Sequence, residues 1–322
     1  PLFLVKIYQL DENNVVLFSL IHHIIWDGWC YDIFRQELAA LYHSNNRGQS
    51  AKLASLPDYQ YADYILWQHK FIKSKEYQQQ LNYWQEKFSA PLPVLDLPTD
   101  FKRPAALNFV GRSIPLYWSE EEITPLERVA RAHGTTLFVL LLTAFKVLLA
   151  RYSGQSEIIV GTPVRGREQG GMDKLIGFFV NNIAIRTKLD LSDSFTNNLL
   201  KVKDGSTEAF DNSQVSFDDI VNQLKLERDP SHTPIYQSFF MYQDATNRNI
   251  DFADLSFKSH PLLRGAAHTD LDFWARRDGG AGMTGGLDCL VDLFSETTLK
   301  RIGQDLKAVL ASVAKSESAL LT

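Results

Sequence analysis

The start of the chain shows two apolar runs separated by a polar break, a pattern that predicts a β-hairpin. The runs cover Leu2–Leu10 and Val15–Ile21, and the stretch between them reads DENN. Two β-rich runs joined by a few polar residues are typical of antiparallel strands. Because large apolar side chains occur throughout both runs, we expect both strands to be largely buried.

Helical periodicity follows the hairpin. Apolar residues within CYDIFRQELAALYHSNN, residues 30–46, recur at the spacing of one helical face. Two further helical segments are predicted within 57–68 and 75–88. Four prolines occur within PLPVLDLPTDFKRPAAL, Pro91–Leu107, three of them in residues 91–98. We therefore predict that Pro91–Leu107 is an irregular, extended connector.

The remainder alternates helices and strands. Ser119 and Glu122 have capping-box spacing and predict a helix start. The apolar run Thr135–Gly154 predicts a buried helix rather than a membrane span, because Thr143 and Lys146 interrupt it. A buried strand is expected at 157–164, and a mobile loop at RGREQGGM, 165–172. The other expected elements are helices at 195–210 and 216–226, strands at 234–243, 250–259, 268–276 and 285–294, and a closing helix capped by Ser295.

Composition narrows the classes of function. With 322 residues, 45% of them hydrophobic, the chain is long enough for two domains or one two-lobed domain. A net charge of -5 disfavours nucleic acid as a partner. Only two cysteines occur, which favours a reducing compartment, and the cytoplasm is the expected location. The start PLFLVKIYQL lacks an initiator Met and the features of a signal peptide, so we expect an incomplete chain that enters within a strand.

The candidate chemistry lies in LIHHIIWDGWC, residues 20–30, where the hairpin passes into a helix. A lone histidine on an apolar strand is more often a packed core residue than a catalyst. Neighbouring strand residues point to opposite faces, so only one of His22 and His23 is expected to face a cavity. Gly28 suits a tight turn, and Asp27 suits a brace that accepts backbone N–H groups or pairs with an arginine. His23, flanked by tryptophans, is the candidate proton acceptor.

Other chemistries find less support in the sequence. A metal site is disfavoured because no HExxH helix, second histidine pair or cysteine cluster completes a coordination shell. A nucleophilic serine is disfavoured because no GxSxG occurs, and Cys30 is interpreted as a small buried residue. RGREQGGM lacks the P-loop pattern of nucleotide sites. Acid/base catalysis without a covalent intermediate remains.

At this point the sequence resembles a known family. HHIIWDG resembles the HHxxxDG signature of the condensation domains of non-ribosomal peptide synthetases, which belong to the chloramphenicol-acetyltransferase-like superfamily. YADYILW at 61–67 is similar to the family's YxDYxxW, IGFFVNNIAIR at 176–186 to IGxFVNTxxxR, and ERDPSHTPIYQSFFMYQ to its RDxSRxPLFQ region. These segments occur in family order and the resemblance covers essentially the whole chain.

The resemblance implies a mixed α/β (α+β) two-layer fold with two chloramphenicol-acetyltransferase-like lobes in a V shape. Residues 1–92 would be the C-terminal part of an incomplete N-lobe and 93–322 the C-lobe, with a tunnel between them. His23 would be catalytic, and His22, Asp27 and Gly28 structural. The residues expected to line the tunnel are Trp29, Phe178, Asn181, Tyr242 and Gln243.

The implied reaction joins two tethered substrates. Donor and acceptor would arrive as thioesters on the phosphopantetheine arms of upstream and downstream carrier proteins, and the acceptor amine would attack the donor carbonyl. His23 would deprotonate the amine or hold it in line. No cofactor or metal would be bound by the chain itself. The expected neighbours are other synthetase modules, of adenylation or polyketide type.

Several departures from the family pattern bear on activity. NSQVSFD at 212–218 stands where HQDxPFE is usual, and Cys30 stands where serine is common. The SxAQ-type and RHxxLR-type front motifs do not occur, and in the family an arginine from that front region is expected to brace the signature aspartate. We therefore expect Asp27 to lack its partner.

Two other functions stay open. A relative that uses free acyl-CoA is one, although the DFGWG motif of many such relatives is absent from the sequence. A catalytically silent docking domain is the other, which the intact HHxxxDG disfavours. Cyclising relatives usually carry DxxxxD, and epimerising ones usually lack the Gly and Trp after the aspartate, so DGWC favours condensation over both.

Overall fold

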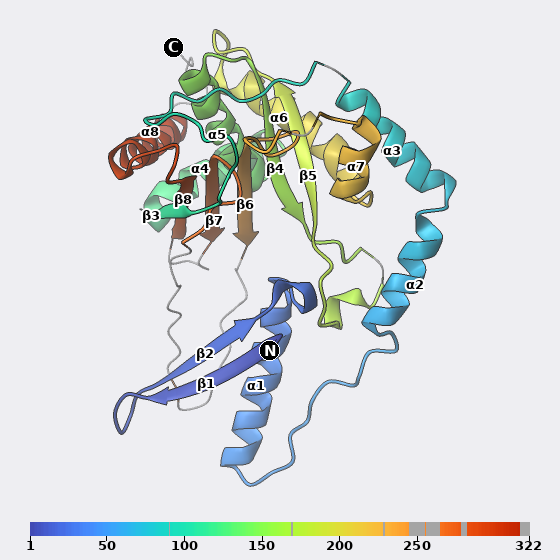
Figure 1. Ribbon diagram of the computed structural model, residues 1–322. Helices are drawn as coiled ribbons and strands as arrows, with labels where there is room; N and C mark the ends of the chain where they lie inside the picture. The colour runs from blue at the N-terminus through green and yellow to red at the C-terminus, as the bar shows by residue number, and fades with distance from the viewer. Residues whose placement is uncertain are drawn as a thin grey trace. The chain divides into compact units, whose positions relative to one another are not determined.

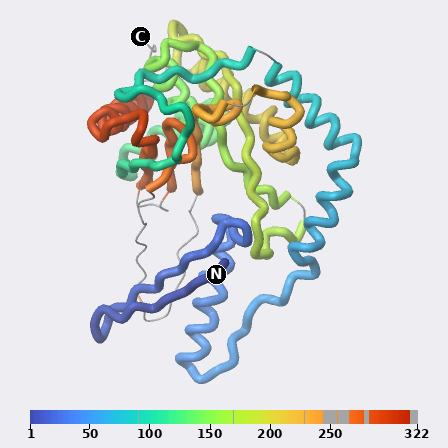
Figure 2. Tube along the Cα trace, in the orientation of Figure 1, coloured from blue at the N-terminus to red at the C-terminus, as the bar shows by residue number. Residues whose placement is uncertain are grey.

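The computed structural model describes residues 1–89, 91–168, 170–227, 229–244, 255, 265–277 and 282–315. The chain forms two compact units. The first comprises residues 1–74, 165–180 and 248–260, and the second comprises 75–164, 181–247 and 261–322. Figure 2 follows the chain as it leaves the second unit after residue 164, runs through 165–180 and returns. The lobe boundary expected between residues 92 and 93 stays a prediction.

The first unit begins with the predicted antiparallel hairpin, β1 (Phe3–Gln9) and β2 (Val15–Ile21), paired from Phe3 with Ile21 to Gln9 with Val15. Asp11 forms its turn by accepting hydrogen bonds from Asn13 N at 2.8 Å and Asn14 Nδ2 at 2.9 Å. This confirms the hairpin.

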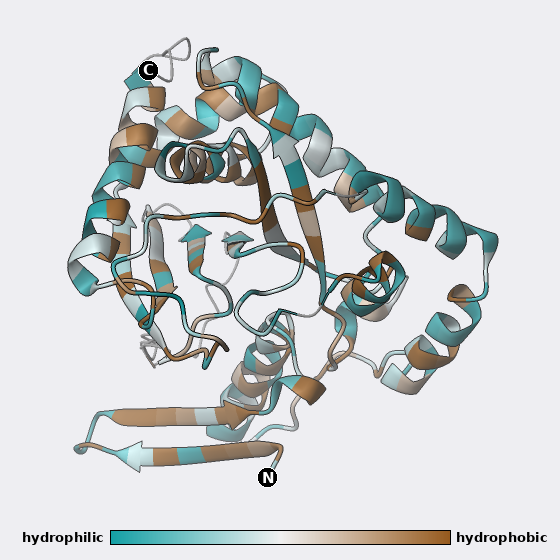
Figure 3. Cartoon of the chain, turned by 45° about the horizontal axis from the view of Figure 1, so that its top comes forward, coloured by the Kyte–Doolittle hydropathy of each residue, from teal (hydrophilic) through white to brown (hydrophobic). Residues whose placement is uncertain are grey.

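The expectation that both strands are largely buried was wrong. Most side chains of the hairpin are exposed, with Ile7 at 70% and Val15 at 58%. Figure 3 shows the hydrophobic residues running along both strands. The physical reason is that a sheet of two strands buries its faces only where other elements cover them. Among the described residues, Phe3 is one point that is covered, because it packs against Trp26 and Phe34.

The described part of the first unit contains two α-helices near the predicted positions and two short 3-10 helices that were not predicted. A short 3-10 helix, His23–Ile25, leads to α1 (Cys30–Asn46), whose bounds match the prediction. Later comes α2 (Tyr61–Phe71), which begins with a capping box between Gln60 and Asp63. Residues 165–180 add a second 3-10 helix, Met172–Lys174. Tyr64, Met172, Leu175 and Phe179 form the apolar core that joins this segment to α2.

The second unit is built on a six-stranded mixed sheet in the order β3-β8-β7-β6-β4-β5. Pairs β3–β8, β8–β7 and β4–β5 are antiparallel, whereas β7–β6 and β6–β4 are parallel. The strands are β3 (Gly111–Trp118), β4 (Glu157–Val164), β5 (Asn181–Lys188), β6 (Ser238–Asp244), β7 (Leu271–Arg277) and β8 (Met283–Leu290). The strand expected at 250–259 lies outside the described residues, except for Leu255.

Helices pack on this sheet and on one another (Figure 1). They are α3 (Lys75–Lys87), α4 (Glu120–Ala132), α5 (Leu137–Ser153), α6 (Phe195–Asp211), α7 (Phe217–Leu224) and α8 (Glu296–Lys315). The predicted Ser119–Glu122 capping box is present, and Ser295 Oγ accepts from Thr298 N at 3.2 Å. Each side chain of α5 from Val139 to Ala150 is buried, which confirms the predicted core helix.

No single helix among the described residues has the length and hydropathy needed to cross a membrane. By length and composition alone, α4 and α5 pass this test as a pair, with a bend of 101° between them.

Candidate functional site

The two histidines of the motif lie just beyond the hairpin. Strand β2 ends at Ile21, His22 has extended backbone, and His23 begins the 3-10 helix. Strand alternation therefore does not apply to this pair, because the strand ends before either residue, and the expectation that only one of them faces a cavity stays a prediction. Instead, His22 Nδ1 accepts a hydrogen bond from Ile24 N at 3.1 Å and caps the 3-10 helix.

Asp27 lies fully buried at the centre of the corner. Its carboxylate accepts hydrogen bonds from the backbone N–H groups of Trp29 at 3.0 Å, Cys30 at 3.3 Å and Phe179 at 3.2 Å. The guanidinium of Arg167 lies 2.9 Å from both carboxylate oxygens. The expectation that Asp27 lacks an arginine partner was wrong, since residues 165–180 supply one.

Arg167 is as buried as its partner, and both side chains have 0% exposure. Its Nη1 donates to the carbonyls of Met172 and Leu175, each at 2.7 Å, and its guanidinium lies 4.1 Å from the centre of the Phe179 ring. The loop that carries Arg167 was expected to be mobile, but the Arg167 side chain is held by hydrogen bonds to Asp27, Met172 and Leu175. Gly166 is required there because its φ is +64° and a Cβ atom would lie 1.9 Å from the Phe179 carbonyl oxygen.

Cys30 joins the same cluster from the first turn of α1. Its thiol donates to Gly177 O at 3.2 Å and accepts from Gly177 N at 3.4 Å, and it also lies 3.3 Å from an Asp27 carboxylate oxygen. Burial raises the pKa of this thiol, and hydrogen bonds from the Asp27 and Gly177 backbone oppose the shift in part. A protonated, enclosed thiol packs and bonds but does not act as a nucleophile.

The side chain of His23, unlike the cluster beneath it, is exposed. Its ring meets the Phe178 ring edge to face, with centroids 5.1 Å apart and planes at 83°. The flanking tryptophans expected beside it have other neighbours. Trp26 is buried against Phe3, Tyr31 and Phe34, and Trp29 lies beneath the guanidinium of Arg165 at 5.6 Å.

Three residues expected to line a tunnel belong to the second unit. Asn181 begins β5, and its amide is fully engaged: Nδ2 donates to Ser213 O at 2.9 Å and Val215 O at 2.6 Å, and Oδ1 accepts from Phe217 N at 3.2 Å. Tyr242 and Gln243 are half-buried in β6, paired with Ala275 and Arg276. Their assignment to a tunnel stays a prediction.

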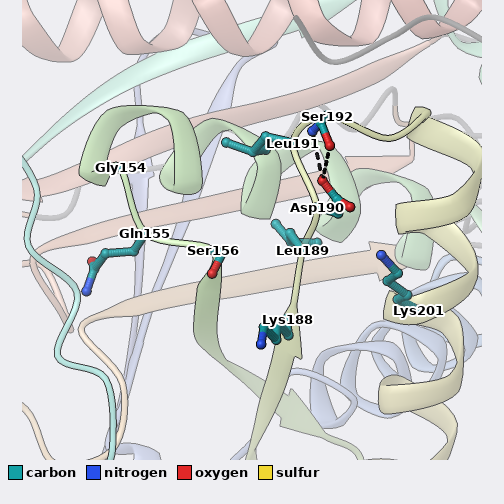
Figure 4. Close-up of a pocket in the computed structure, with 9 residues that line it drawn as sticks. All are labelled: Gly154, Gln155, Ser156, Lys188, Leu189, Asp190, Leu191, Ser192 and Lys201. Atoms are coloured by element: carbon teal, nitrogen blue, oxygen red, sulfur yellow. Dashed lines mark hydrogen bonds between the residues drawn. The ribbon is translucent and has the colours of Figure 1, made fainter.

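A pocket of about 650 Å³ lies elsewhere in the second unit, at the ends of α5, β4 and β5 beside α6 (Figure 4). Its lining contains Lys188 and Lys201, but the nearby Asp190 carboxylate is used by Ser192, which donates to it from N at 3.0 Å and Oγ at 2.6 Å. None of the predicted site residues lines it. Among the described residues, no group of three or more His, Cys, Asp or Glu side chains is arranged to hold a metal ion.

Sequence reasoning missed two residues of this site. The pattern RGREQGGM predicts only a loop that is unsuited to nucleotides, whereas its Arg167 pairs with an aspartate 140 positions away. The segment YADYILW assigns no role to its first residue, Tyr61, whereas the Tyr61 Oη donates to Phe178 O at 2.7 Å. The signal for Arg167 was weak, because nothing in a local pattern distinguishes a buried arginine from a solvated one.

The geometry is that of an exposed imidazole next to a buried, charged brace. A neutral imidazole in such a position can accept a proton from a bound amine or donate and accept hydrogen bonds with it. The hydrogen-bonded cluster of Asp27, Arg167 and Cys30 fixes the backbone on which that imidazole is carried.

Comparison with known proteins places this arrangement in context. A family model described as "Condensation domain" matches residues 1–321. Gramicidin S synthase 2 of Brevibacillus brevis is 31% identical over 325 residues, covering 100% of this chain and 7% of that protein. Surfactin synthase subunit 1 of Bacillus subtilis (strain 168) is 33% identical over 301 residues, covering 94% of this chain and 8% of that protein. The chain thus spans a small part of these relatives.

Solved structures share the fold. The X-domain from teicoplanin biosynthesis matches with a TM-score of 0.85 at 24% identity, covering 99% of this chain and 74% of that one. The first condensation domain of the calcium-dependent antibiotic synthetase, in complex with a substrate analogue, matches with a TM-score of 0.80 at 20% identity, covering 99% and 69%. The predicted mixed α/β, chloramphenicol-acetyltransferase-like fold class is confirmed. The chain belongs to the condensation-domain family of non-ribosomal peptide synthetases.

Proposed function

We propose that this chain forms an amide bond between two carrier-tethered substrates in non-ribosomal peptide biosynthesis. The donor is an acyl or peptidyl thioester and the acceptor an aminoacyl thioester, each on the phosphopantetheine arm of a carrier protein. The observation that carries the proposal is the exposed imidazole of His23 on a corner braced by the buried Asp27–Arg167 pair. Membership of the condensation-domain family supports the same reaction class.

The proposed reaction balances without any further reactant. The acceptor amine nitrogen attacks the donor carbonyl carbon and forms the C–N bond, and the C–S bond of the donor thioester breaks. The proton lost by the nitrogen passes to the leaving sulfur, through His23 where His23 acts as the base, and the sulfur departs as a free thiol. The peptide remains on the acceptor carrier.

A large part of the acceleration is expected from holding both tethered substrates in attack geometry. In favourable cases such positioning lowers a barrier by roughly 7–11 kcal/mol. The chain then needs no resident cofactor of its own. Its partners under this proposal are the upstream and downstream carrier proteins and neighbouring synthetase modules, and its location is the cytoplasm.

The predicted site residues take distinct roles in the proposal. His23 contacts the amine, and His22, Asp27 and Gly28 hold the corner in shape. His22 does so by capping the 3-10 helix and Asp27 through its three backbone hydrogen bonds. The residues proposed to line the substrate passage are Trp29, Phe178, Asn181, Tyr242 and Gln243.

The test is an assay with separately loaded donor and acceptor carriers, read by the intact mass of the acceptor carrier. We expect His23→Ala to abolish the mass of the condensed product. His69→Ala is the matched control, because His69 is an exposed histidine of α2 in the same unit, and it should keep wild-type turnover. Wild-type turnover by His23→Ala would remove the proposed role of that residue.

A third variant separates the two possible actions of His23. Glutamine can hydrogen-bond to an amine but cannot take its proton near neutral pH. If His23 holds the amine in line, His23→Gln retains part of the rate, and if His23 acts as a base, His23→Gln is as inactive as His23→Ala.

Two competing functions give different outcomes in the same assay. A CoA-dependent acyltransferase would form product from acyl-CoA and a free acceptor without carriers. A silent docking domain would give no product with any variant. The likeness in fold to the teicoplanin X-domain, which has been solved in complex with OxyB, motivates including this second outcome.

A further inference from the structure

The backbone of residues 177–179 is held at three successive positions by three different side chains of the first unit. The thiol of Cys30 bonds to both polar groups of Gly177. The phenol of Tyr61 donates to Phe178 O at 2.7 Å, and Asp27 accepts from Phe179 N at 3.2 Å. A segment bonded at each residue in turn has little freedom to shift, so the side chain of Phe178 leaves the backbone from a fixed point.

Tyr61 fits closely against this segment. Its ring packs on that of Phe179 with centroids 5.1 Å apart, and a Cβ atom on Gly177 would lie 2.4 Å from the Tyr61 ring. Burial raises the pKa of the Tyr61 phenol, and the negative charge of Asp27 adds to the shift. The phenol therefore stays protonated and keeps donating to the Phe178 carbonyl.

The ring of Phe178 turns away from this packed cluster and is 38% exposed. There it meets the imidazole of His23 at 5.1 Å and 83°. Edge-to-face pairs of this kind stabilise one relative orientation of the two rings beyond the area that they bury, by enough to favour it several-fold.

The orientation of His23 has no hydrogen-bonded support in the described part of the first unit. In catalytic histidines one ring nitrogen is often held by a carboxylate or carbonyl, which fixes the ring and its tautomer. Within residues 1–74, 165–168 and 170–180, no hydrogen bond to an imidazole nitrogen of His23 is present. The contact with Phe178 is thus the observed constraint on the ring.

We propose that Phe178 orients the imidazole of His23 for the amine, and that Tyr61 sets the position of Phe178 through its hydrogen bond to the Phe178 carbonyl. Tyr61 is a positioning residue, since it acts through Phe178 and His23. Phe178 has this positioning role in addition to its proposed place in the substrate passage. The inference rests on the proposed function for its kinetic consequence, but the contact itself is testable without turnover. It also gives a role to YADYILW, of which Tyr61 is the first residue, and to position 178, the first variable position of the IGxFVNTxxxR pattern.

The first test is nuclear magnetic resonance of the full chain labelled at histidine, with the His23 signals assigned from their loss in His23→Ala. We expect Phe178→Leu to move the His23 ring signals, because the ring current of Phe178 is removed. Tyr61→Phe should move the same signals while its melting temperature stays close to that of wild type. Phe34→Leu is the control, because Phe34 packs against Phe3 and Trp26 and should affect stability without moving the His23 signals.

The second test is kinetic and uses loaded carriers. Phe178→Leu should lower kcat by a larger factor than it changes the KM for either carrier, and Phe178→Tyr, which keeps the ring, should restore the rate. Loss of one neutral hydrogen bond corresponds to about a fivefold change, which is the decrease in kcat expected for Tyr61→Phe. Tyr59→Phe, an exposed phenol in the same unit, should change nothing.

The outcomes separate this inference from the proposed function. If the wild-type chain gives no product from loaded carriers, the proposed function fails, whereas the His23 signals can still report the Phe178 contact. If His23→Ala keeps full turnover, the proposed role of His23 in the reaction fails, and with it the kinetic consequence of the Phe178 contact. If His23→Ala is inactive but Phe178→Leu leaves both the His23 signals and kcat unchanged, the positioning role is overturned. Movement of the signals with Phe178→Leu but not with Tyr61→Phe overturns the role of Tyr61.

Discussion

Asp27 and Arg167 form an ion pair in which both carboxylate oxygens lie 2.9 Å from one guanidinium nitrogen, with neither side chain exposed. The pair joins the corner after β2 to residues 165–180. Taking two charges out of water is costly, and the pair is tolerated because each partner has further hydrogen bonds. Arg167 bonds to two carbonyls and Asp27 to three N–H groups.

Breaking this pair on one side should be severe. Asp27→Ala or Arg167→Met alone leaves a buried charge without its partner, and we expect each to lower the free energy of unfolding by about 3–5 kcal/mol. The double variant should lose less than the sum of the two, because both charges leave together. Urea unfolding of the four proteins measures this. Additive losses would contradict the coupling, and Asp27→Ala with wild-type stability but no activity would make Asp27 a direct participant in the reaction.

The brace illustrates what sequence reasoning can reach. The role of Asp27 as an acceptor at a strand-to-helix corner follows from local chemistry, because an aspartate before a helix has backbone N–H groups within reach. Its arginine could not be found in this way. Arg167 lies in the segment between β4 and β5, and which long-range partner such a segment reaches depends on packing that no local pattern contains.

The hairpin shows a different limit. Apolar runs at Leu2–Leu10 and Val15–Ile21 predict strands correctly, and the bounds of α1 and β4 also follow from pattern alone. Burial does not follow in the same way, because the pattern reports which residues favour burial and not what covers them. Ile7 and Val15 are therefore apolar strand residues that lie exposed.

The loop that carries Arg167 offers a test with two nearby glycines. Gly166→Ala should lower the free energy of unfolding by more than about 1 kcal/mol, because an alanine at positive φ is strained and its Cβ would collide with the Phe179 carbonyl. Gly170→Ala is the matched control, since a Cβ there meets nothing within 4 Å. Thermal melting of both variants decides the point, and equal stability of the two would show that Gly166 is not held in this conformation.

We expect the side chain of Asn181 to stabilise the fold in addition to any contact with substrate. Its amide bonds to Ser213 O, Val215 O and Phe217 N, so Asn181→Ala leaves these groups unsatisfied and should lower the free energy of unfolding by about 1–3 kcal/mol. Asn182→Ala, the next residue of β5 and similarly half-buried, is the control. If Asn181→Ala melts like wild type but loses turnover, the amide contacts substrate and its place in the tunnel gains direct support.

Lys146 should make stability depend on pH. It is fully buried in α5, and its Nζ lies 2.6 Å from Ile185 O, 2.8 Å from Thr187 Oγ1 and 3.3 Å from Ile158 O. Burial lowers the pKa of Lys146 well below its ordinary 10.5, and the charge of Lys87 adds to this. Below pH 10.5 the unfolded chain therefore binds a proton at this residue that the folded chain does not bind until the lower pKa is reached.

The proton that the unfolded chain binds at Lys146 therefore lowers the free energy of unfolding as the pH falls below 10.5. The decrease is up to about 1.4 kcal/mol per pH unit and ends when the pH reaches the pKa of Lys146 in the folded state. Lys146→Met removes that proton uptake. The free energy of unfolding in urea of the variant minus that of the wild type should thus become larger as the pH is lowered from 10 to 7. Lys203→Met on α6, a lysine that is not fully buried, controls for the loss of one charge and should give a flat difference. A flat difference for Lys146→Met as well would mean that the buried amine keeps its proton in the fold, with its three oxygen partners accepting from an ammonium group.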